Sequence, residues 1–455
     1  MRHLHLPRRG VLLGGASLAL GAYATLPSGG SAADRVAAGV QRPRVPPRVR
    51  LVTDHGAKPG DVDALPGFLA AVAAAADAGG GRVIVPAGDW RLDGPIHLRS
   101  RVDLHLEEGA TLRFTPDARF YPTVFTRWEG TEVYNHSPLI YARGQTDVAL
   151  TGKGRIEGGG RDYWFTWRPE QRPDQTRLRQ MGADGVPVDQ RVFGLGHKLR
   201  PAFVQFIDCR RVLIEGPHFE DSPFWVLHPV YCDHVTVRDV SIRSKHLNSD
   251  GCDPDSCTNV LIESCRFDVS DDCVAVKSGR DQDGWRVARP SSRIVVRDCE
   301  MNTDIAAAFA IGSEMSGGAH DIWVERLRVP SAEHAIYVKA NLDRGGLIER
   351  IRIRDIDVVQ TETLIHFTTA YHSWRGGNFP PTYRDFLVEN VRCERAEQAL
   401  HIVGVETAPV QDVRLSDIVV GTVSAPDAIA HVRNLQLDRV SVAGRTVTFD
   451  SGGVA

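Results

Sequence analysis

Two observations predict an all-β chain that is coiled into a parallel β-solenoid. The 455 residues include 43 glycines and many short runs with valine and isoleucine, which is typical of strands joined by turns. A short pattern of alternating apolar residues also recurs, as RVLIEG at 211–216, NVLIESC at 259–265 and DIWVERL at 321–327. Between residues 212 and 435 successive copies begin 22–35 residues apart, so strand-like alternation lies inside a longer repeat.

Stacking of these repeats explains the pattern better than a β-sandwich does. One repeat is too small to bury its own apolar face, and parallel coils stacked about 4.8 Å apart bury that face in common. A sandwich would require strands every 8–12 residues joined by tight turns, whereas these repeats are longer and variable. An alanine-rich segment at 64–81 has helical spacing and ends in glycines. We expect it to cap the open N-terminal end of the solenoid.

The first residues have the order of an export signal. Residues 1–33 contain basic residues, an apolar run and then small residues, and this run is too short to span a membrane. Arg8 and Arg9 lie directly before the apolar run, which suggests twin-arginine export, with cleavage after Ala33 as a plausible boundary. We therefore expect a secreted protein.

The remaining chain is expected to form one domain. Residues 34–50 are a lead-in rich in proline and arginine, and 51–455 form a single β-helix domain with no linker inside it. The net charge of −3, without a basic stripe, gives no indication of a nucleic-acid partner. We expect a monomer that does not bind membranes.

The eight cysteines allow two interpretations. Cys209, Cys232 and Cys257 take the same place before successive strands, which favours free thiols stacked in a core, while one or two disulfides remain the alternative. There is no CxxC pair and the histidines are scattered, so we expect no zinc site.

Three carboxylates are the main candidates for chemistry. Asp250 lies 21 residues before the pair Asp271–Asp272, which is close to the shortest repeat, so we expect the three to be neighbours on adjacent coils. Clustered carboxylates repel one another and are costly without a function. Two acids separated by a water are what inverting glycoside hydrolysis requires, typically about 6.5–9.5 Å apart.

The chain resembles glycoside hydrolase family 28, the polygalacturonase-like pectinases, over roughly 51–440. Asn248-Ser249-Asp250 resembles the family's Asn-Thr-Asp motif, Ser270-Asp271-Asp272 its Gly-Asp-Asp motif, and AIGSEMSGG at 310–318 matches as well. The resemblance implies a right-handed parallel β-helix and inverting hydrolysis of a pectic polysaccharide or oligosaccharide without metal or organic cofactor. It implies that Asp271 is the general acid and that Asp250 and Asp272 position and activate water, with Asn248 and Lys339 binding substrate.

Two positions depart from the family's pattern. Ala306 stands where the family has a histidine, and Tyr337 stands where it has an arginine two residues before Lys339. A phenol does not replace a bidentate arginine clamp, although Tyr337 could stack on a sugar. One hypothesis is an active enzyme with a modified or non-homogalacturonan substrate, and another is a catalytically weakened glycan-binding protein. His246 and His334 are candidates for the missing imidazole.

Other features have weaker functional interpretations. Asp253 and Asp255 resemble a calcium loop only superficially and are expected to be turn residues. The polar insertion at 164–185 is a candidate wall for one end of a cleft, which would favour action on chain ends. Four tryptophans lie in excursions and either line a sugar cleft or pack in loops: Trp128, Trp164, Trp167 and Trp374. A polysaccharide lyase, which shares solenoid architecture, is a further alternative.

Overall fold

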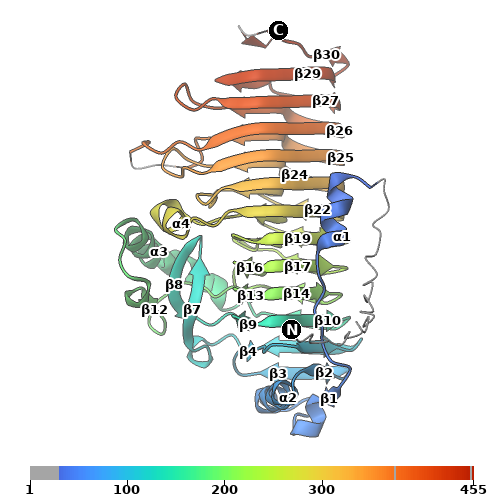
Figure 1. Cartoon of the computed structure of the whole chain (residues 1–455), viewed down its shortest axis with the longest axis vertical. Coiled ribbons are helices and arrows are strands. Elements are labelled where there is room, and N and C mark those ends of the chain that lie inside the picture. The colour runs from blue at the N-terminus through green and yellow to red at the C-terminus, as the bar shows by residue number, and fades with distance from the viewer. Residues whose placement is uncertain (1–29, 373–375, 451–452, 455) are drawn as a thin grey trace, which may run out of the picture.

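The molecule is a tall stack of parallel β-coils (Figure 1). A computed structural model describes residues 30–372, 376–450 and 453–454. Most coils contribute one strand to each of three columns, and neighbouring coils pair in parallel within a column. The coil of β17 and β18 reaches the third column only through isolated bridges at Cys252 and Asp255. From β24 onward, long bent strands run through all three columns or two of them without a break.

The first two columns begin at the N-terminal coils and share the long strands above them. The first column contains β1 (Val49–Leu51), β2 (Gly81–Val85), β5 (Val102–Leu106), β10 (Thr146–Gly152), β14 (Arg210–Glu215), β17 (Asp233–Arg238) and β19 (Thr258–Glu263). The second contains β3 (Gly88–Leu92), β6 (Ala110–Phe114), β11 (Arg155–Glu157), β15 (His218–Glu220), β18 (Ser241–Ser244) and β20 (Arg266–Val269). Both continue into β22 (Ser291–Thr303), β24 (Ala319–Lys339), β25 (Leu347–Thr368), β26 (Thr382–Val403), β27 (Val410–Thr422) and β29 (Val432–Val442).

The third column carries the cavity described below. Its strands are β4 (Ile96–His97), β9 (Ile140–Arg143), β13 (Val204–Ile207), β16 (Leu227–Val230), β21 (Val274–Val276) and β23 (Ala307–Gly312), followed by the ends of β24, β25 and β26 and by β28 (Ala428–Ala430). Outside the columns lie β7 (Thr123–Trp128), β8 (Thr131–His136) and β12 (Val192–Phe193), and near the C-terminus β30 (Arg445–Thr446), β31 (Phe449–Asp450) and β32 (Gly453–Val454).

The recurring apolar residues of the sequence fill the interior as ladders. Val235 of β17 pairs in register with Val260 of β19, which pairs with Ile294 of β22, and none of the three side chains is exposed to solvent. Stacking in register lets each coil cover the apolar side chains of the next. The predicted parallel solenoid is confirmed, and the sandwich alternative is wrong.

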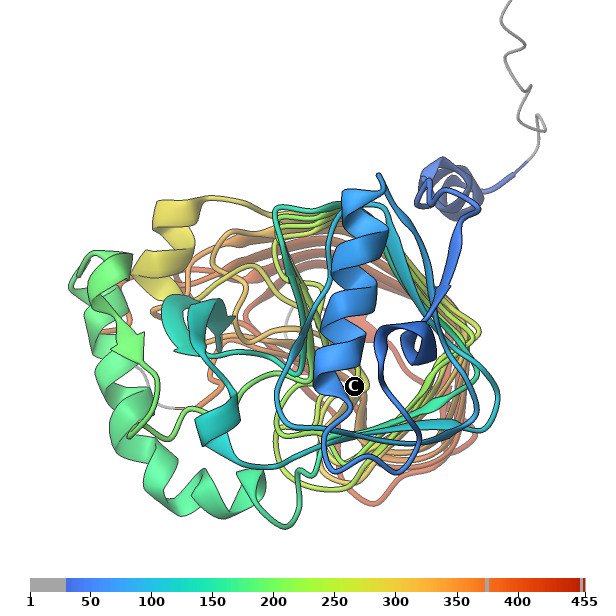
Figure 2. The same ribbon diagram turned by 90° about the horizontal axis from the view of Figure 1, so that it is seen from below.

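A helix covers the N-terminal end of the stack, as the sequence predicts. Helix α2 (Leu65–Asp77) crosses the open end of the first coils, as Figure 2 shows from below. Its Phe68 and Ala71 are fully buried against the first coils. The helix therefore shields the coil edge that would otherwise present unpaired apolar surface.

The N-terminal part of the described chain lies along the outside of the solenoid. Helix α1 (Ala32–Gly39) packs through Ala33 and Val36 against Leu261 and Val295, which point outward from β19 and β22. The helix begins at the cap residue Ser31, whose side chain accepts a hydrogen bond from the Asp34 backbone N–H. Most of the predicted signal at 1–33 lies outside the described residues.

The proline- and arginine-rich lead-in packs onto the outer surface, and its last two residues, Val49 and Arg50, enter β1. The Arg44 backbone N–H donates to Asp147 at 2.8 Å, and the Gln41 backbone N–H contacts a His234 ring nitrogen. The eight cysteines are buried and unpaired in the described part of the chain, which agrees with the stacked-thiol interpretation. No helix among the described residues is long and apolar enough to cross a membrane.

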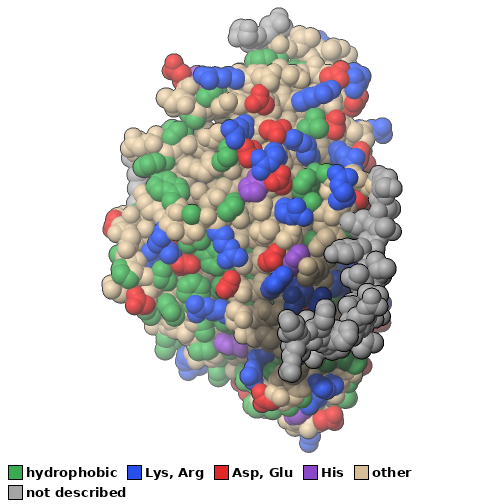
Figure 3. All heavy atoms as spheres, in the orientation of Figure 1, with side chains coloured by type: hydrophobic (Ala, Val, Ile, Leu, Met, Phe, Trp, Pro, Cys, Tyr) green, Lys and Arg blue, Asp and Glu red, His purple; other side chains and the backbone are tan. Residues whose placement is uncertain are grey.

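Charges of both signs alternate on the outer surface. Figure 3 shows lysine and arginine side chains interspersed with aspartate and glutamate over the visible face. Many pairs join neighbouring coils, such as Arg326 with Asp298 at 2.6 Å and Arg350 with Asp321 at 2.7 Å. Exposed pairs of this kind each contribute about 0–1 kcal/mol. The face therefore carries no basic stripe.

Excursions from the coils gather beside the third column. The antiparallel hairpin of β7 and β8, helix α3 (Arg168–Ala183) and the short helix α4 (Asp281–Val287) lie together on one side of the stack (Figure 1). The segment 164–185, predicted only as a polar insertion, is largely helical: α3 begins with a proline in its first turn, where no backbone donor is lost, and tolerates a second proline, Pro173, inside it. These excursions form the wall of a cavity.

Candidate active site

Asp250, Asp271 and Asp272 meet on the third column, as their spacing predicts. The backbone of Gly251 donates to the Asp272 carbonyl oxygen at 2.8 Å, so the two acidic segments lie on adjacent coils. One carboxylate oxygen from each of the three aspartates lies within 4.8 Å of the others. That is closer than the separation of about 6.5–9.5 Å that is typical of inverting acid pairs.

Asp271 is held by backbone donors and has a raised pKa. Its Oδ2 accepts from the Asn248 backbone N–H and its Oδ1 from the Asp272 backbone N–H, each at 3.0 Å. Burial and then the neighbouring Asp272 raise the pKa of Asp271 above its ordinary value, although Lys339 acts against them. The side chain is therefore suited to keep a proton in weakly acidic solution.

Asp272 forms an ion pair with Lys339. Its Oδ2 accepts from the Lys339 ammonium at 2.7 Å, and its Oδ1 accepts from the Ala307 backbone N–H at 3.0 Å. Burial would lower the pKa of Lys339, but the adjacent Asp272 raises it, so the lysine stays charged. Both carboxylate oxygens of Asp272 are thus bound by donors.

Asp250 lies at the back of the cluster beside a second lysine. Its Oδ2 is 3.4 Å from the Lys277 ammonium, while its Oδ1 has no hydrogen-bond partner among the described residues. Burial, followed by Asp253 and Asp271, raises the pKa of Asp250 well above its ordinary value. Asp250 therefore differs from Asp272, whose oxygens all have partners.

The prediction that Asp253 and Asp255 are turn residues is wrong. Both side chains are completely buried. Asp255 pairs with the buried Arg127 of β7 at 2.9 Å, while both oxygens of Asp253 have no partner in the described chain. The sequence pattern could not reveal this, because the segment resembles a turn yet its backbone pairs with β16 and β21 on either side.

Asn248 and Tyr337, the other two residues that the sequence predicts to bind substrate, differ in whether they line the cavity. Asn248 lines the cavity, and its side-chain oxygen accepts from Arg200 at 2.6 Å. Tyr337 is nearly buried and does not line the cavity, because its ring stacks on His366 at 4.5 Å. Lys339 extends over the Tyr337 ring, with Nζ 5.0 Å from the ring centre.

Neither candidate for the missing imidazole reaches the cavity lining. His246 contacts the Ser222 carbonyl oxygen, and the His334 ring lies against Tyr337 and His366. The backbone of His334 nevertheless donates to the Ala306 carbonyl oxygen, so this histidine lies on the coil next to the position that lacks the family histidine.

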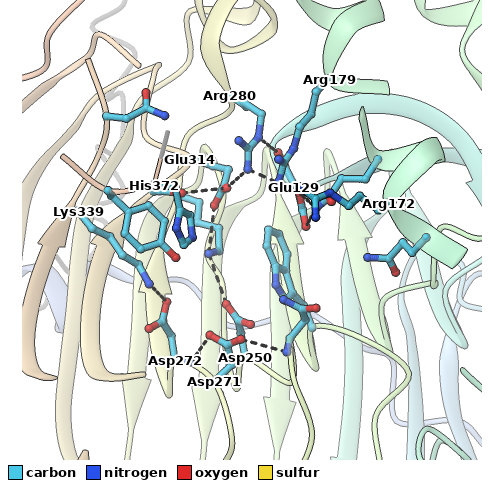
Figure 4. Close-up of a pocket in the computed structure, with 18 of the residues that line it drawn as sticks. Glu129, Arg172, Arg179, Asp250, Asp271, Asp272, Arg280, Glu314, Lys339 and His372 are labelled. Carbon is cyan, nitrogen blue, oxygen red and sulfur yellow. Dashed lines mark hydrogen bonds and ion pairs between the residues drawn. The ribbon is translucent and has the colours of Figure 1, made fainter. Parts of the chain in front are cut away.

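The aspartates form the floor of a cavity of about 740 Å³ (Figure 4). Five acids line it, together with seven cationic side chains, namely Arg168, Arg172, Arg179, Lys277, Arg280, Lys339 and Arg344. The excess of cations favours an anionic ligand. Figure 4 shows Arg172 and Arg179 on the side opposite Lys339, with the aspartates below.

Most of these cations are held in a buried ion network, but two are not. Arg280 pairs with Glu314 and lies 3.6 Å from Glu129, which also accepts from Arg179. Burial would raise the pKa of Glu314, yet Arg280 and Lys277 lower it well below its ordinary value. Arg168 and Arg172, on the exposed face of α3, have no ion pair within the described chain. These two remain available to an anion.

The α3 wall contributes cavity-lining residues that the sequence did not single out. Arg168, Arg172 and Arg179 come from the insertion at 164–185, whose position relative to the aspartates the repeat does not specify. Lys277 could have been found, because it follows β21 at the register position that Lys339 occupies at the end of β24. Trp225 also lines the cavity, with its ring 4.3 Å from Lys277.

The predicted tryptophans are not part of the lining. Trp128, Trp164 and Trp167 are buried in packing between the excursions and the coils. Trp374 lies outside the described residues. Loop packing is therefore the correct interpretation for the three tryptophans that the structure describes.

Comparisons with known proteins agree with the fold and with the site. The model of the family "Glycosyl hydrolases family 28" matches residues 189–442. A probable polygalacturonase of Vitis vinifera is 29% identical over 359 residues, covering 75% of this chain and 67% of its own. An endo-polygalacturonase of Pectobacterium carotovorum subsp. carotovorum is 23% identical over 304 residues, covering 64% and 67%.

Solved structures give the same picture. A hyperthermoactive exopolygalacturonase from Thermotoga maritima is 37% identical with a TM-score of 0.87, covering 91% of this chain and 96% of its own. A polygalacturonase from Erwinia carotovora ssp. carotovora has a TM-score of 0.66 at 19% identity, covering 88% and 98%, and supports the fold alone. The right-handed parallel β-helix is thereby confirmed, and the chain belongs to glycosyl hydrolase family 28, as a polygalacturonase-like glycoside hydrolase.

Proposed function

We propose that the protein is an exported hydrolase that removes galacturonate units from one end of a pectic chain. The observation that carries this proposal is the cluster of three aspartates on the floor of a cationic cavity. Hydrolysis requires an acid at the leaving oxygen and a base at the water, and cations bind the uronate carboxylates.

In this proposal Asp271 is the general acid. Its raised pKa supports the role, because a carboxyl group that keeps its proton can donate it to the glycosidic oxygen as the bond breaks. Asp250 and Asp272 position and activate the water. Of the two, Asp272 is better suited to take the water's proton, because it faces a lysine that stays charged. Asp250, which lines the cavity and has a pKa raised well above its ordinary value, is better suited to orient that water by a hydrogen bond.

We propose inversion at the anomeric carbon on the strength of the family resemblance. The oxygen spacing within 4.8 Å gives this stereochemistry no support of its own, because inverting pairs are typically farther apart. Proton NMR of the first product anomer decides the point. A first product with the anomeric configuration of the substrate would refute inversion.

Action at a chain end is supported by the wall that α3 forms. Arg168 and Arg172 face one end of the cavity without partners in the described chain, so they can pair with the carboxylates of a terminal galacturonate. A chain that continued in that direction would meet the helix. The exopolygalacturonase from Thermotoga maritima, at 37% identity, supports the same mode of action.

The positive charge of the cavity lining makes a uronate the substrate that we expect. The sequence favoured a modified or non-homogalacturonan substrate, because Tyr337 cannot make the contacts of an arginine. The five arginines that line the cavity come from other segments of the chain. They can supply the positive charge that Tyr337 lacks. We therefore propose galacturonate at the chain end. We also propose secretion by the twin-arginine route, supported by Arg8 and Arg9 before an apolar run.

Asp271→Asn tests the proposal. The variant is expected to lose about 10²- to 10⁴-fold in the release of galacturonate from oligogalacturonides, because it lacks the acid. Its circular dichroism and melting profile should match those of wild type. Near wild-type rates would refute the role of Asp271. A wild type without activity would support the weakened binder, and products that absorb in the ultraviolet would indicate a lyase.

A further inference from the structure

Lys277 belongs to a ladder of the third column and has no role yet in the proposed mechanism. It directly follows β21, and the register of β21 with β23, extended by one residue, places it beside Gly312, which pairs with Lys339. Two lysines thus lie in one ladder with a glycine between them. Lys339 pairs with Asp272 at 2.7 Å, and Lys277 lies 3.4 Å from Asp250. Each aspartate that handles the water in the proposed mechanism therefore has a lysine of its own.

The Lys277 ammonium is surrounded by acceptors of the protein. Its Nζ lies 3.4 Å from an oxygen of Asp250, 3.4 Å from an oxygen of Glu314 and 3.5 Å from the Gly312 carbonyl oxygen. It also faces the Trp225 ring, whose centre is 4.3 Å away, and only 2% of the residue is exposed. An ammonium has three N–H donors, so these three acceptors account for all of them. None is left for a carboxylate of the substrate.

Glu314 is a fixed anchor for Lys277. Its side chain is almost fully buried, pairs with Arg280 and accepts from the Ser313 hydroxyl at 3.1 Å. Figure 4 shows Glu314 between Arg280 and Asp250, with dashed contacts on both sides. Opposite charges on either side hold the Glu314 carboxylate in place. Lys277 thereby joins Asp250 to the buried ion network of the cavity.

Asp250 depends on Lys277 for its position. Lys277 is the one side chain among the described residues that pairs with the Asp250 carboxylate, because Oδ1 of Asp250 has no partner there. Burial would lower the pKa of Lys277, yet the carboxylates around it raise that pKa well above its ordinary value. In order of influence these are Asp253, Glu314, Asp250 and Asp272. The lysine therefore stays charged and holds the one carboxylate oxygen of Asp250 that has a partner.

We propose that Lys277 is a positioning residue for hydrolysis, which fixes the Asp250 carboxyl group at the floor of the cavity so that it can orient the attacking water. This inference rests on the proposed function, in which Asp250 acts on that water. Lys277 acts through Asp250 and does not bind the substrate, in contrast to Arg168 and Arg172. A misplaced acid slows the chemical step without changing the contacts that bind the uronate.

The separate effects on kcat and KM test this role. Lys277→Met is expected to lower kcat for oligogalacturonides about 10- to 100-fold, the scale of losing a hydrogen bond to a charged group. KM should change less than about twofold. Lys245→Met is the matched control, because Lys245 pairs with Asp268 and Asp304 outside the cavity lining, and it should match wild type. A rise in KM at unchanged kcat, or a kcat equal to that of wild type, would overturn the proposal.

A double-variant cycle tests whether Lys277 acts through Asp250. In the Asp250→Asn background, Lys277→Met should lower kcat by less than about threefold, because the group that it positions is already gone. Lys277→Gln, which removes the charge and keeps polar donors, should follow the same pattern in both backgrounds, so the test does not depend on one variant. An equally large loss in both backgrounds would overturn the positioning role.

Crystal structures give a readout that does not need activity. In Lys277→Met and Lys277→Gln the Asp250 carboxyl group should turn away from its wild-type position, whereas in Lys245→Met it should stay. An Asp250 that keeps its position in both Lys277 variants would overturn the proposal. A displaced Asp250 in a protein whose wild type hydrolyses nothing would instead overturn the proposed hydrolysis alone.

Discussion

Substitution of Asp255 by alanine is expected to loosen the hairpin that carries part of the cavity wall. Asp255 pairs with Arg127 of β7 at 2.9 Å, and neither side chain is exposed. The guanidinium also donates to Ser256 at 3.0 Å and lies 4.8 Å from the Tyr231 ring centre. Asp255 is its only carboxylate partner among the described residues. The variant would therefore leave a buried charge without compensation.

The loss of stability expected for Asp255→Ala follows from the burial of the Arg127–Asp255 ion pair. Removal of one partner of a buried ion pair destabilises a protein by about 3–5 kcal/mol. If this energy is localised in the hairpin, amide exchange in β7 and β8 should accelerate by about 10²- to 10⁴-fold, because each 1.4 kcal/mol is a factor of ten. Local exchange is the appropriate measurement, since stacked repeats need not unfold in one cooperative step.

Two matched variants make the experiment decisive. Asp255→Asn keeps the shape and one acceptor, so its effect should be smaller. Arg127→Met combined with Asp255→Leu removes both charges and should recover much of the loss, because apolar replacements of buried pairs are often neutral. Exchange in Asp255→Ala within about tenfold of wild type, or a double variant as impaired as the single one, would refute the reasoning.

Three further outcomes are expected. Burial raises the pKa of Asp253 well above its ordinary value, so the folded state keeps a proton that the unfolded chain releases above about pH 4. The contribution of Asp253 to the free energy of unfolding should then fall as pH rises toward neutral, with a limiting slope of about 1.4 kcal/mol per pH unit for one proton. Asp253→Asn should flatten this dependence in urea titrations, and parallel curves for the two proteins would contradict it. Arg168→Ala and Arg172→Ala should each raise KM for oligogalacturonides about 10- to 100-fold with a small change in kcat, as loss of a charge-assisted contact predicts. Arg177→Ala, on the same helix outside the cavity lining, should match wild type, and an equal loss in that control would discard the chain-end contact. Intact-mass analysis of exported protein should place the N-terminus at or before Ser31, because cleavage after Ala33 removes the cap and a buried residue of α1. A mature chain that begins at Asp34 would show that α1 is dispensable.

The repeat in the sequence was sufficient to predict the coils. Alternating apolar residues recur at intervals that place Val235, Val260 and Ile294 in one ladder, and the structure stacks them without solvent exposure. The same interval predicted that Asp250 and Asp271–Asp272 are neighbours. Local pattern specifies this much, because a solenoid contact joins residues that are one repeat apart.

The wall of the site depended on contacts that no repeat encodes. Glu129 and Arg172 come from different excursions, and only tertiary packing brings them together on one side of the cavity above Asp271. Asp253 and Asp255 are a second example of burial that the local pattern does not encode. Their turn-like sequence is buried because its backbone pairs with the neighbouring coil on each side.

The sequence by itself determined the solenoid, its capping helix and the three aspartates, because each depends on spacing along the chain. Tertiary structure alone decided that Tyr337 packs on His366 instead of lining the cavity, and that arginines from α3 supply the positive charge. The physical reason is that long polar excursions have no fixed register with the coils. Their position is set by burial and charge pairing with residues more than a hundred positions away, such as Arg127 with Asp255.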